Sequence, residues 1–219
     1  MISLYTNRVA ATLDRLYREA ERRDDATLPL ARAECERRGE PFDDRTVASL
    51  LDDAFICVAP ETGRLLYQLV RLRRPELVVE FGTSFGLSAI HIAAALEDNG
   101  HGRLISAEIN GPKAARATEH LREAGVASRV EVRRGDALET LAGLTSIDML
   151  LLDGWKGLYL PMLLELESGL ARGAAIVADD LKIMPEILAP YLEYVRNPAN
   201  GYLSCEIPLS DGLELSLRG

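Results

Sequence analysis

Two stretches decide the fold of this chain: IDMLLLDGWKGLYLP at residues 147–161 and AAIVADDL at residues 174–181. Each contains a short apolar run that is typical of a buried parallel strand, and each run ends in acidic residues. Open α/β sheets bind ligands in the crevice outside the carboxyl ends of their strands. We therefore expect Asp153, Asp179 and Asp180 to converge on one crevice.

This acidic crevice has two interpretations. Three carboxylates do not crowd together without a compensating charge, and oxygen ligands of this kind suit Mg²⁺ or a similar divalent cation. The first hypothesis is therefore a metal site formed by Asp153, Asp179 and Asp180. The alternative is that one acid caps the following helix while the others are solvated loop residues, and the two runs alone do not decide between them.

From about residue 56 onward, the rest of the chain alternates strand and helix patterns. Apolar strand patterns begin at Leu77 (LVVEF), Arg103 (RLISAEI) and Val130 (VEVRRGD), and helical patterns of ten or more residues separate them. This alternation predicts an α/β fold with a parallel sheet. At the end, YLSCEIPL and LELSLRG flank the turn sequence SDG at residues 210–212, which predicts an antiparallel hairpin at the sheet edge.

The first 55 residues are helical in pattern and highly charged. Apolar residues repeat at a spacing of three or four from Val9 to Ala20 and again from Val47 to Ala54, and GEPFDD at residues 39–44 breaks the pattern. We predict a single domain over residues 1–219. Residues 1–55 form a helical extension that packs over an α/β core of residues 56–219.

Composition narrows the class of protein. The 219 residues are 47% apolar, and the net charge of −9 argues against a nucleic-acid or anionic-membrane partner and favours a small-molecule ligand. The three cysteines suggest neither a disulfide framework nor a zinc cluster, so a reducing compartment is expected. The start of the chain carries no signal-peptide pattern and no apolar run is long enough to span a bilayer, which predicts a cytoplasmic protein without membrane association.

The segment VVEFGTSFGLSAIHIA at residues 78–93 predicts the cofactor end of the crevice. Its glycines, Gly82 and Gly86, would let the backbone approach a ligand, but their spacing is not that of a dinucleotide fingerprint. The next strand ends in Glu108, placed to accept both hydroxyls of a ribose, and the third ends near Asp136, placed to meet an adenine amino group. Acids in these positions suit S-adenosylmethionine, although Glu108 and Asp136 could each be an ordinary helix N-cap.

These motifs carry a family resemblance. From about Val58 to its end the chain resembles the catechol O-methyltransferase-like family of class I methyltransferases, through VVEFGTSFGLSAIHIA, LISAEIN, LLLDGWKGLYLP, IVADD and DGLE. The resemblance implies a Rossmann-like, doubly wound, mostly parallel seven-stranded sheet with a C-terminal antiparallel hairpin and an N-terminal helical appendage that walls the acceptor pocket. It also implies a Mg²⁺-dependent transfer of a methyl group from S-adenosylmethionine to a hydroxyl of a catechol-like aromatic acceptor.

The resemblance assigns site residues by position. By this resemblance Lys156 matches the general base. A neighbouring metal and sulfonium would disfavour the charged form of its amine, which would allow it to accept a proton. The resemblance also implies that the acceptor contacts Lys156, Asp180 and Glu214. The residues expected at the cofactor are Glu80, Gly82, Thr83, Ser84, Gly86, Ser88, Glu108, Asp136, Ala137, Asp153 and Trp155. Two positions depart from the family: Gly154 replaces a histidine near the adenine, and Asp180 replaces an asparagine among the metal ligands.

Rival functions remain open at this point. One is a metal-independent methyltransferase acting on another small nucleophile, and another is a module that binds S-adenosylmethionine without catalysis. Lys156 could be a solvated lysine at a helix start, and Trp155 could be plain core packing. The sequence does not identify the acceptor, the regioselectivity or the metal, and it leaves the oligomeric state open, with a homodimer among the states considered.

Overall fold

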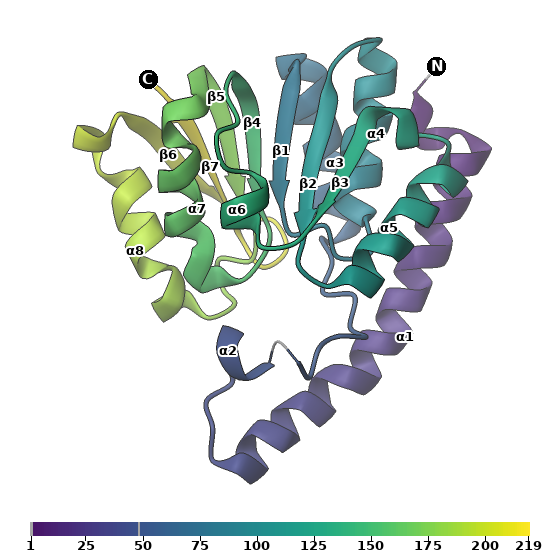
Figure 1. Cartoon of the computed structure of the whole chain (residues 1–219), viewed down its shortest axis with the longest axis vertical. Helices are drawn as coiled ribbons and strands as arrows, with labels where there is room; N and C mark the ends of the chain where they lie inside the picture. The colour runs from purple at the N-terminus through teal and green to yellow at the C-terminus, as the bar shows by residue number, and fades with distance from the viewer. Residues whose placement is uncertain (1, 48) are drawn as a thin grey trace.

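The computed structural model describes residues 2–47 and 49–219. Within them the strands form one seven-stranded sheet in the order β3-β2-β1-β4-β5-β7-β6 (Figure 1). The first five strands are parallel, and β7 pairs antiparallel with both β5 and β6. The strands are β1 (Leu77–Phe81), β2 (Arg103–Glu108), β3 (Val130–Arg134), β4 (Ile147–Leu152), β5 (Leu170–Ala178), β6 (Tyr202–Ile207) and β7 (Leu213–Arg218). This confirms the predicted Rossmann-like sheet with a C-terminal hairpin.

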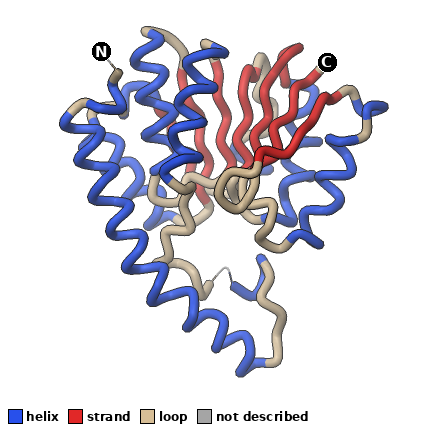
Figure 2. The backbone as a smooth tube through the Cα atoms, turned by 180° about the vertical axis from the view of Figure 1, so that it is seen from behind, coloured by secondary structure: helices blue, strands red, loops and turns tan. Residues whose placement is uncertain are grey.

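Helices cover both faces of the sheet (Figure 1, Figure 2). One face packs against α3 (Pro60–Arg73), α4 (Leu87–Asn99), α5 (Gly111–Ala124) and the first half of α1 (Asn7–Arg38). The other packs against α6 (Ala137–Thr140), α7 (Tyr159–Leu166) and α8 (Pro185–Arg196). Short 3-10 turns are η1 (Ser3–Tyr5), η2 (Ala127–Arg129), η3 (Lys156–Leu158), η4 (Glu167–Gly169) and η5 (Pro198–Asn200).

Local sequence explains where several helices begin and end. Asn110 caps α5 by accepting a hydrogen bond from Lys113 N, and Gly125 ends that helix in the left-handed conformation. Helix α1 ends in the same way at Gly39, which lies in the segment predicted to break the helix. No helix within residues 2–47 and 49–219 combines the length and the apolar content needed to cross a membrane.

Residues 24–55, which we call the arm, leave the sheet and return to it. The lower half of α1 projects beyond the sheet, and α2 (Asp44–Val47) lies on the returning segment (Figure 1). Asp24 closes the arm at its base, because its carboxylate accepts hydrogen bonds from Phe55 N at 2.6 Å and Ile56 N at 3.0 Å.

The arm has an apolar cluster of its own, separate from the two clusters on the sheet. Its buried members are Ala31, Cys35, Val47, Leu51 and Ala54, and Trp155 packs against it. The apolar spacing predicted a second amphipathic helix across residues 47–54; residue 48 lies outside the described residues, and for residues 49–54 the prediction is wrong. Helix α2 ends at Val47, and the N–H groups of Leu50 and Leu51 both bond to Val47 O in a turn, so burial comes from packing within the arm.

Candidate active site

A cavity of about 820 Å³ lies at the carboxyl ends of the parallel strands. Its walls come from the loops that follow β1, β2, β3, β4 and β5 and from the arm. Apolar arm side chains such as Phe42 and Leu51 face the same space as Trp155 and Lys156. The cavity is therefore placed where an open α/β sheet binds ligands.

The loop after β1 approaches β4 so closely that it requires glycine. Gly82 has φ +102, and a Cβ there would lie 2.3 Å from the carbonyl oxygen of Asp153. Gly86 has φ +90 and begins α4. Gly82 and Ser84 line the cavity, whereas Gly86, Thr83 and Ser88 do not, and both Thr83 and Ser88 are buried.

Glu80 lies beneath this loop, fully buried. Ser106 Oγ donates a hydrogen bond to its Oε2, while Oε1 has no hydrogen-bond partner. Burial raises the pKa of Glu80 to about 7, against the lowering effect of the nearby Ser106 and Ser88 hydroxyls. A buried carboxylate oxygen without a donor is a position that a cationic ligand group would stabilise.

Glu108, which ends β2, and Asp136, which lies two residues after β3, both line the cavity. Glu108 accepts hydrogen bonds from Ser84 N at 2.7 Å and Asn110 N at 2.9 Å, which fixes its carboxylate at the mouth of the glycine loop. Asp136 is the N-cap of α6, because its side chain accepts a hydrogen bond from Leu138 N at 2.9 Å, and it also lines the cavity. Ala137, the next residue, lines the cavity as well.

The residues after β4 form the opposite wall. Lys156 is buried, and its Nζ donates to Tyr159 Oη at 2.7 Å and lies 2.9 Å from Asp180 Oδ2. Tyr159 Oη in turn donates to Asp179 O at 3.1 Å. Lys156 is thus not a solvated surface lysine: it is held in a fixed position on the cavity wall.

Steric crowding explains why a glycine follows Asp153. A Cβ at Gly154 would lie 2.5 Å from Cζ of the Phe81 ring, so Phe81 occupies the space that a side chain at residue 154 would need. Trp155 lines the cavity, is half-buried and packs against the cluster of the arm.

Asp153, Asp179 and Asp180 are close enough to influence one another. Burial raises the pKa of Asp153 well above its usual range, and the charges of Asp179 and Asp180 add to this rise. Burial and the Asp180 charge raise the pKa of Asp179 to about 7. Asp153 and Asp180 line the cavity, whereas Asp179 is buried behind it. Among residues 2–47 and 49–219, however, no group of three or more His, Cys, Asp or Glu side chains is arranged to hold a metal ion.

The structure does not bring Glu214 to the cavity. Glu214 lies opposite Ala178 on the sheet, which places its side chain on the face covered by α8. There its carboxylate is buried and accepts hydrogen bonds from both Nε (2.9 Å) and Nη2 of Arg196 and from Ser204 Oγ. A one-residue difference in register decides the face, and the motif DGLE carries no information on register.

Several cavity residues were absent from the sequence-based site. Arg32, Phe42, Asp44 and Asp52 come from the arm, and Lys113 comes from α5. No motif marks the arm residues, because tertiary contacts set the course of the arm. Asn110 and Tyr159 belong to the motifs LISAEIN and YLP. Their positions beside Glu108 and Lys156 could therefore have been predicted from the sequence.

Known proteins resemble both the sequence and this fold. A family model described as a methyltransferase domain matches residues 79–181. The catechol O-methyltransferase of Sus scrofa is 34% identical over 148 residues, which cover 64% of this chain and 77% of that protein. Catechol O-methyltransferase B of Danio rerio is 33% identical over 174 residues, covering 73% of this chain, and the chain spans 64% of the length of that relative. The crystal structure of cofactor-bound Rv0187 from MTB aligns with a TM-score of 0.68 at 26% identity, covering 89% of this chain and 90% of that one.

The sheet order, the glycine loop and these similarities define the class as a class I methyltransferase fold. Within that class, the chain belongs to the catechol O-methyltransferase-like family. The resemblance inferred from the motifs is confirmed.

Proposed function

We propose that this protein is an S-adenosylmethionine-dependent O-methyltransferase that methylates a hydroxyl of a catechol-like small molecule. One observation carries the proposal. A single cavity is lined both by the glycine loop and Glu108 and by Trp155 and the buried Lys156. Cofactor and acceptor would therefore share one cavity.

The residues at the cofactor end suit S-adenosylmethionine. The missing side chain at Gly82 lets the loop pack against the backbone of Asp153 while Gly82 lines the cavity, and the fixed carboxylate of Glu108 can accept from ribose hydroxyls. Glu80 is fully buried beneath the loop and does not line the cavity, so a cationic amino group in the cavity would act on its carboxylate by electrostatic attraction and not by contact. When bound, S-adenosylmethionine supplies an electrophilic methyl group on sulfur.

The acceptor end supplies alignment and a proton acceptor. Lys156 Nζ would remove the proton from the acceptor hydroxyl as its oxygen attacks the methyl carbon. Tyr159 and Asp180 hold that amine in place from two sides. Because this reaction requires an in-line arrangement, orientation by the cavity walls can contribute about 7 to 11 kcal/mol of the barrier reduction.

A divalent cation such as Mg²⁺ stays part of the proposal on electrostatic grounds alone. The mutual repulsion of Asp153, Asp179 and Asp180 favours a positive charge among them. Their side chains, as placed, do not gather into a ligand set, so no step of the mechanism is routed through a metal. The same observation favours a second candidate, a metal-independent methyltransferase that relies on Lys156 alone for deprotonation.

One experiment tests the proposal and separates these candidates. The purified chain is incubated with S-adenosylmethionine and a panel of catechols and monophenols, with Mg²⁺ or with a chelator, and methylated products are measured by mass spectrometry. Methylation of catechols that is lost on chelation supports the metal-dependent reaction. Full activity in chelator favours the second candidate, and cofactor binding without any product would contradict an enzymatic function.

A further inference from the structure

Among the cationic side chains that the structure describes at the cavity, Arg32 is the one that has neither an ion pair nor a hydrogen bond. Three lysines line the cavity, and each has an acceptor: Lys113 donates to Leu51 O (3.1 Å), Lys156 to Asp180 (2.9 Å) and Lys182 to Ser210 O (3.3 Å). Arg32 lines the same cavity, yet it has neither an ion pair nor a hydrogen-bond acceptor among the residues that the structure describes.

The acids that the arm contributes to the cavity are already engaged. Asp44 accepts from Gly157 N at 2.7 Å, and Asp52 accepts from the Asn110 amide at 2.9 Å. Neither is the partner of Arg32. The charge of Arg32 is thus left for a group that enters the cavity.

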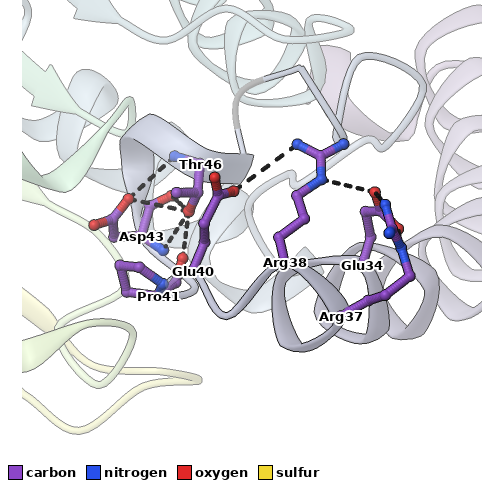
Figure 3. A network of polar contacts seen from close by, with 7 residues as sticks. All are labelled: Glu34, Arg37, Arg38, Glu40, Pro41, Asp43 and Thr46. Atoms are coloured by element: carbon purple, nitrogen blue, oxygen red, sulfur yellow. Dashed lines mark hydrogen bonds and ion pairs between the residues drawn. The ribbon is translucent and has the colours of Figure 1, made fainter.

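The neighbouring arginines of the arm form ion pairs with glutamates. Glu34 binds Arg37 and Arg38, and Arg38 also reaches Glu40 at 3.9 Å (Figure 3). Arg32 is not part of this network. The glutamates of this segment therefore compensate two arginines that do not line the cavity, and not Arg32, which does.

Hydrogen bonds of Thr46 fix the turn that carries Phe42, the ring on which Arg32 stacks. Thr46 Oγ1 donates to Pro41 O, and Thr46 N donates to Asp43 Oδ1 at 3.1 Å, which holds the turn on both sides of Phe42 (Figure 3). The Arg32 guanidinium lies 4.4 Å from the centroid of the Phe42 ring. A guanidinium stacked on an aromatic ring keeps its N–H edge available for a carboxylate.

The position of Arg32 matches an acceptor that extends from Lys156 toward the arm. Leu28, one helical turn before Arg32, also lines the cavity, so this face of α1 is turned toward the bound molecule. Trp155, next to Lys156, packs against the cluster of the arm. The acceptor space thus runs between Lys156 and the wall that carries Arg32.

We propose that Arg32 recognises an anionic substituent on the acceptor, so that the preferred substrate is a vicinal dihydroxy aromatic acid rather than a neutral catechol. This inference rests on the proposed O-methyltransferase function and specifies its substrate class. Arg32 is exposed, and a charge-assisted pair at such a site is weakened by water. We expect a preference of about tenfold for the anion.

Binding can be measured apart from turnover with a matched pair of ligands. The probes are 3,4-dihydroxybenzoate and its neutral amide, 3,4-dihydroxybenzamide, titrated calorimetrically into the full chain saturated with S-adenosylhomocysteine. The variants are Arg32→Gln and the control Arg18→Gln, which removes the same charge from an exposed position of α1 outside the cavity lining. Thermal unfolding of each variant verifies the fold.

The expected result is tighter binding of the benzoate by the wild type and by Arg18→Gln, and equal binding of both ligands by Arg32→Gln. Equal affinities in the wild type, no benzoate binding, or a preference that survives in Arg32→Gln would each overturn the proposal. Methylation of the two ligands is assayed separately. A preference in binding without methyl transfer would refute the proposed function while retaining the role of Arg32.

Discussion

Lys156 receives two different constraints from its neighbours. Tyr159 is fully buried, and burial raises its pKa well above the usual range, so its phenol stays protonated and can donate to Asp179 O while accepting from Lys156. Asp180 contributes the only carboxylate that the described residues bring within ion-pair distance of the amine. The amine is oriented on the cavity wall before any acceptor binds.

Replacement of Lys156 tests whether this amine is a base. Lys156→Ala should lower kcat by about 10²- to 10⁴-fold with nearly unchanged S-adenosylmethionine affinity. Lys156→Arg should be almost as impaired, because a guanidinium keeps its proton at neutral pH. Steady-state rates with catechols of decreasing hydroxyl pKa provide the check. Acceptors that are already ionised should lose much less, and an equal loss across the series would assign Lys156 to positioning instead.

Gly82 tests the close approach of the first loop to β4. With φ +102 and a backbone carbonyl 2.3 Å from any added Cβ, Gly82→Ala should destabilise the fold by more than about 3 kcal/mol, because strain and a backbone clash combine. Gly39→Ala is the matched control: its φ is +65, but nothing lies within 4 Å of the added atom, so about 1 kcal/mol is expected. Urea unfolding measures both, and equal losses would argue against the clash.

At the scale of the elements, the strands and the mostly parallel sheet with its C-terminal hairpin were predictable, whereas the arm was not. Runs such as LVVEF and IDMLLL are fully or nearly fully buried strands, and burial on both faces leaves the uninterrupted apolar pattern that the sequence displays. Residues 47–54 show helical spacing, yet their burial depends on contacts with the lower half of α1 and with Trp155. Such contacts join positions far apart in the chain and leave no local pattern.

The residues of the candidate site likewise fall into those that the sequence predicts and those that depend on tertiary structure. Glu108 ends β2, Asp136 lies two residues after β3 and Asp153 directly follows β4, so their arrival at one edge is a consequence of a parallel sheet. Glu214 lies on an antiparallel strand, where alternation assigns each residue to one face and the register must be known. Arg32 and Asp44 reach the cavity only because the arm folds back over it.

The contact between α2 and η3 yields a prediction for the arm. Asp44 accepts a hydrogen bond from Gly157 N, next to Lys156, and thus links the arm to the cavity wall that carries Lys156. Asp44→Ala should increase the hydrogen-exchange rate of the Gly157 amide about fivefold, since a single such bond contributes about 1 kcal/mol. Asp25→Ala, an exposed acid on the same arm, is the control and should leave that amide unchanged. Unaltered exchange in Asp44→Ala would mean that the arm is held elsewhere.

At the scale of the whole molecule, buried titratable groups oppose one another in their effect on stability. Burial lowers the pKa of His91 to about 4, so the fold gains stability as pH rises from that value toward the ordinary value of 6.5. Burial raises the pKa of Glu80 to about 7, so the fold loses stability as pH rises from about 4.5 to 7. Asp179 acts in the same direction as Glu80. The stability profile of the wild type alone therefore does not isolate any of these groups.

A difference between two variants isolates Glu80. In the folded state Glu80 retains its proton up to about pH 7, while in the unfolded chain it loses it near its ordinary value of 4.5, so ionising it costs the fold about 3 kcal/mol between these limits. Glu80→Gln keeps the shape but cannot ionise, and the contributions of His91 and Asp179 cancel in the comparison. The unfolding free energy of Glu80→Gln minus that of the wild type, measured in urea, should rise by about 3 kcal/mol from pH 4.5 to pH 8. Glu139→Gln, an exposed acid on α6, should give a nearly flat difference. A flat difference for Glu80→Gln as well would show that its carboxylate is already compensated in the folded protein, and it would remove the reason for placing a cationic ligand group there.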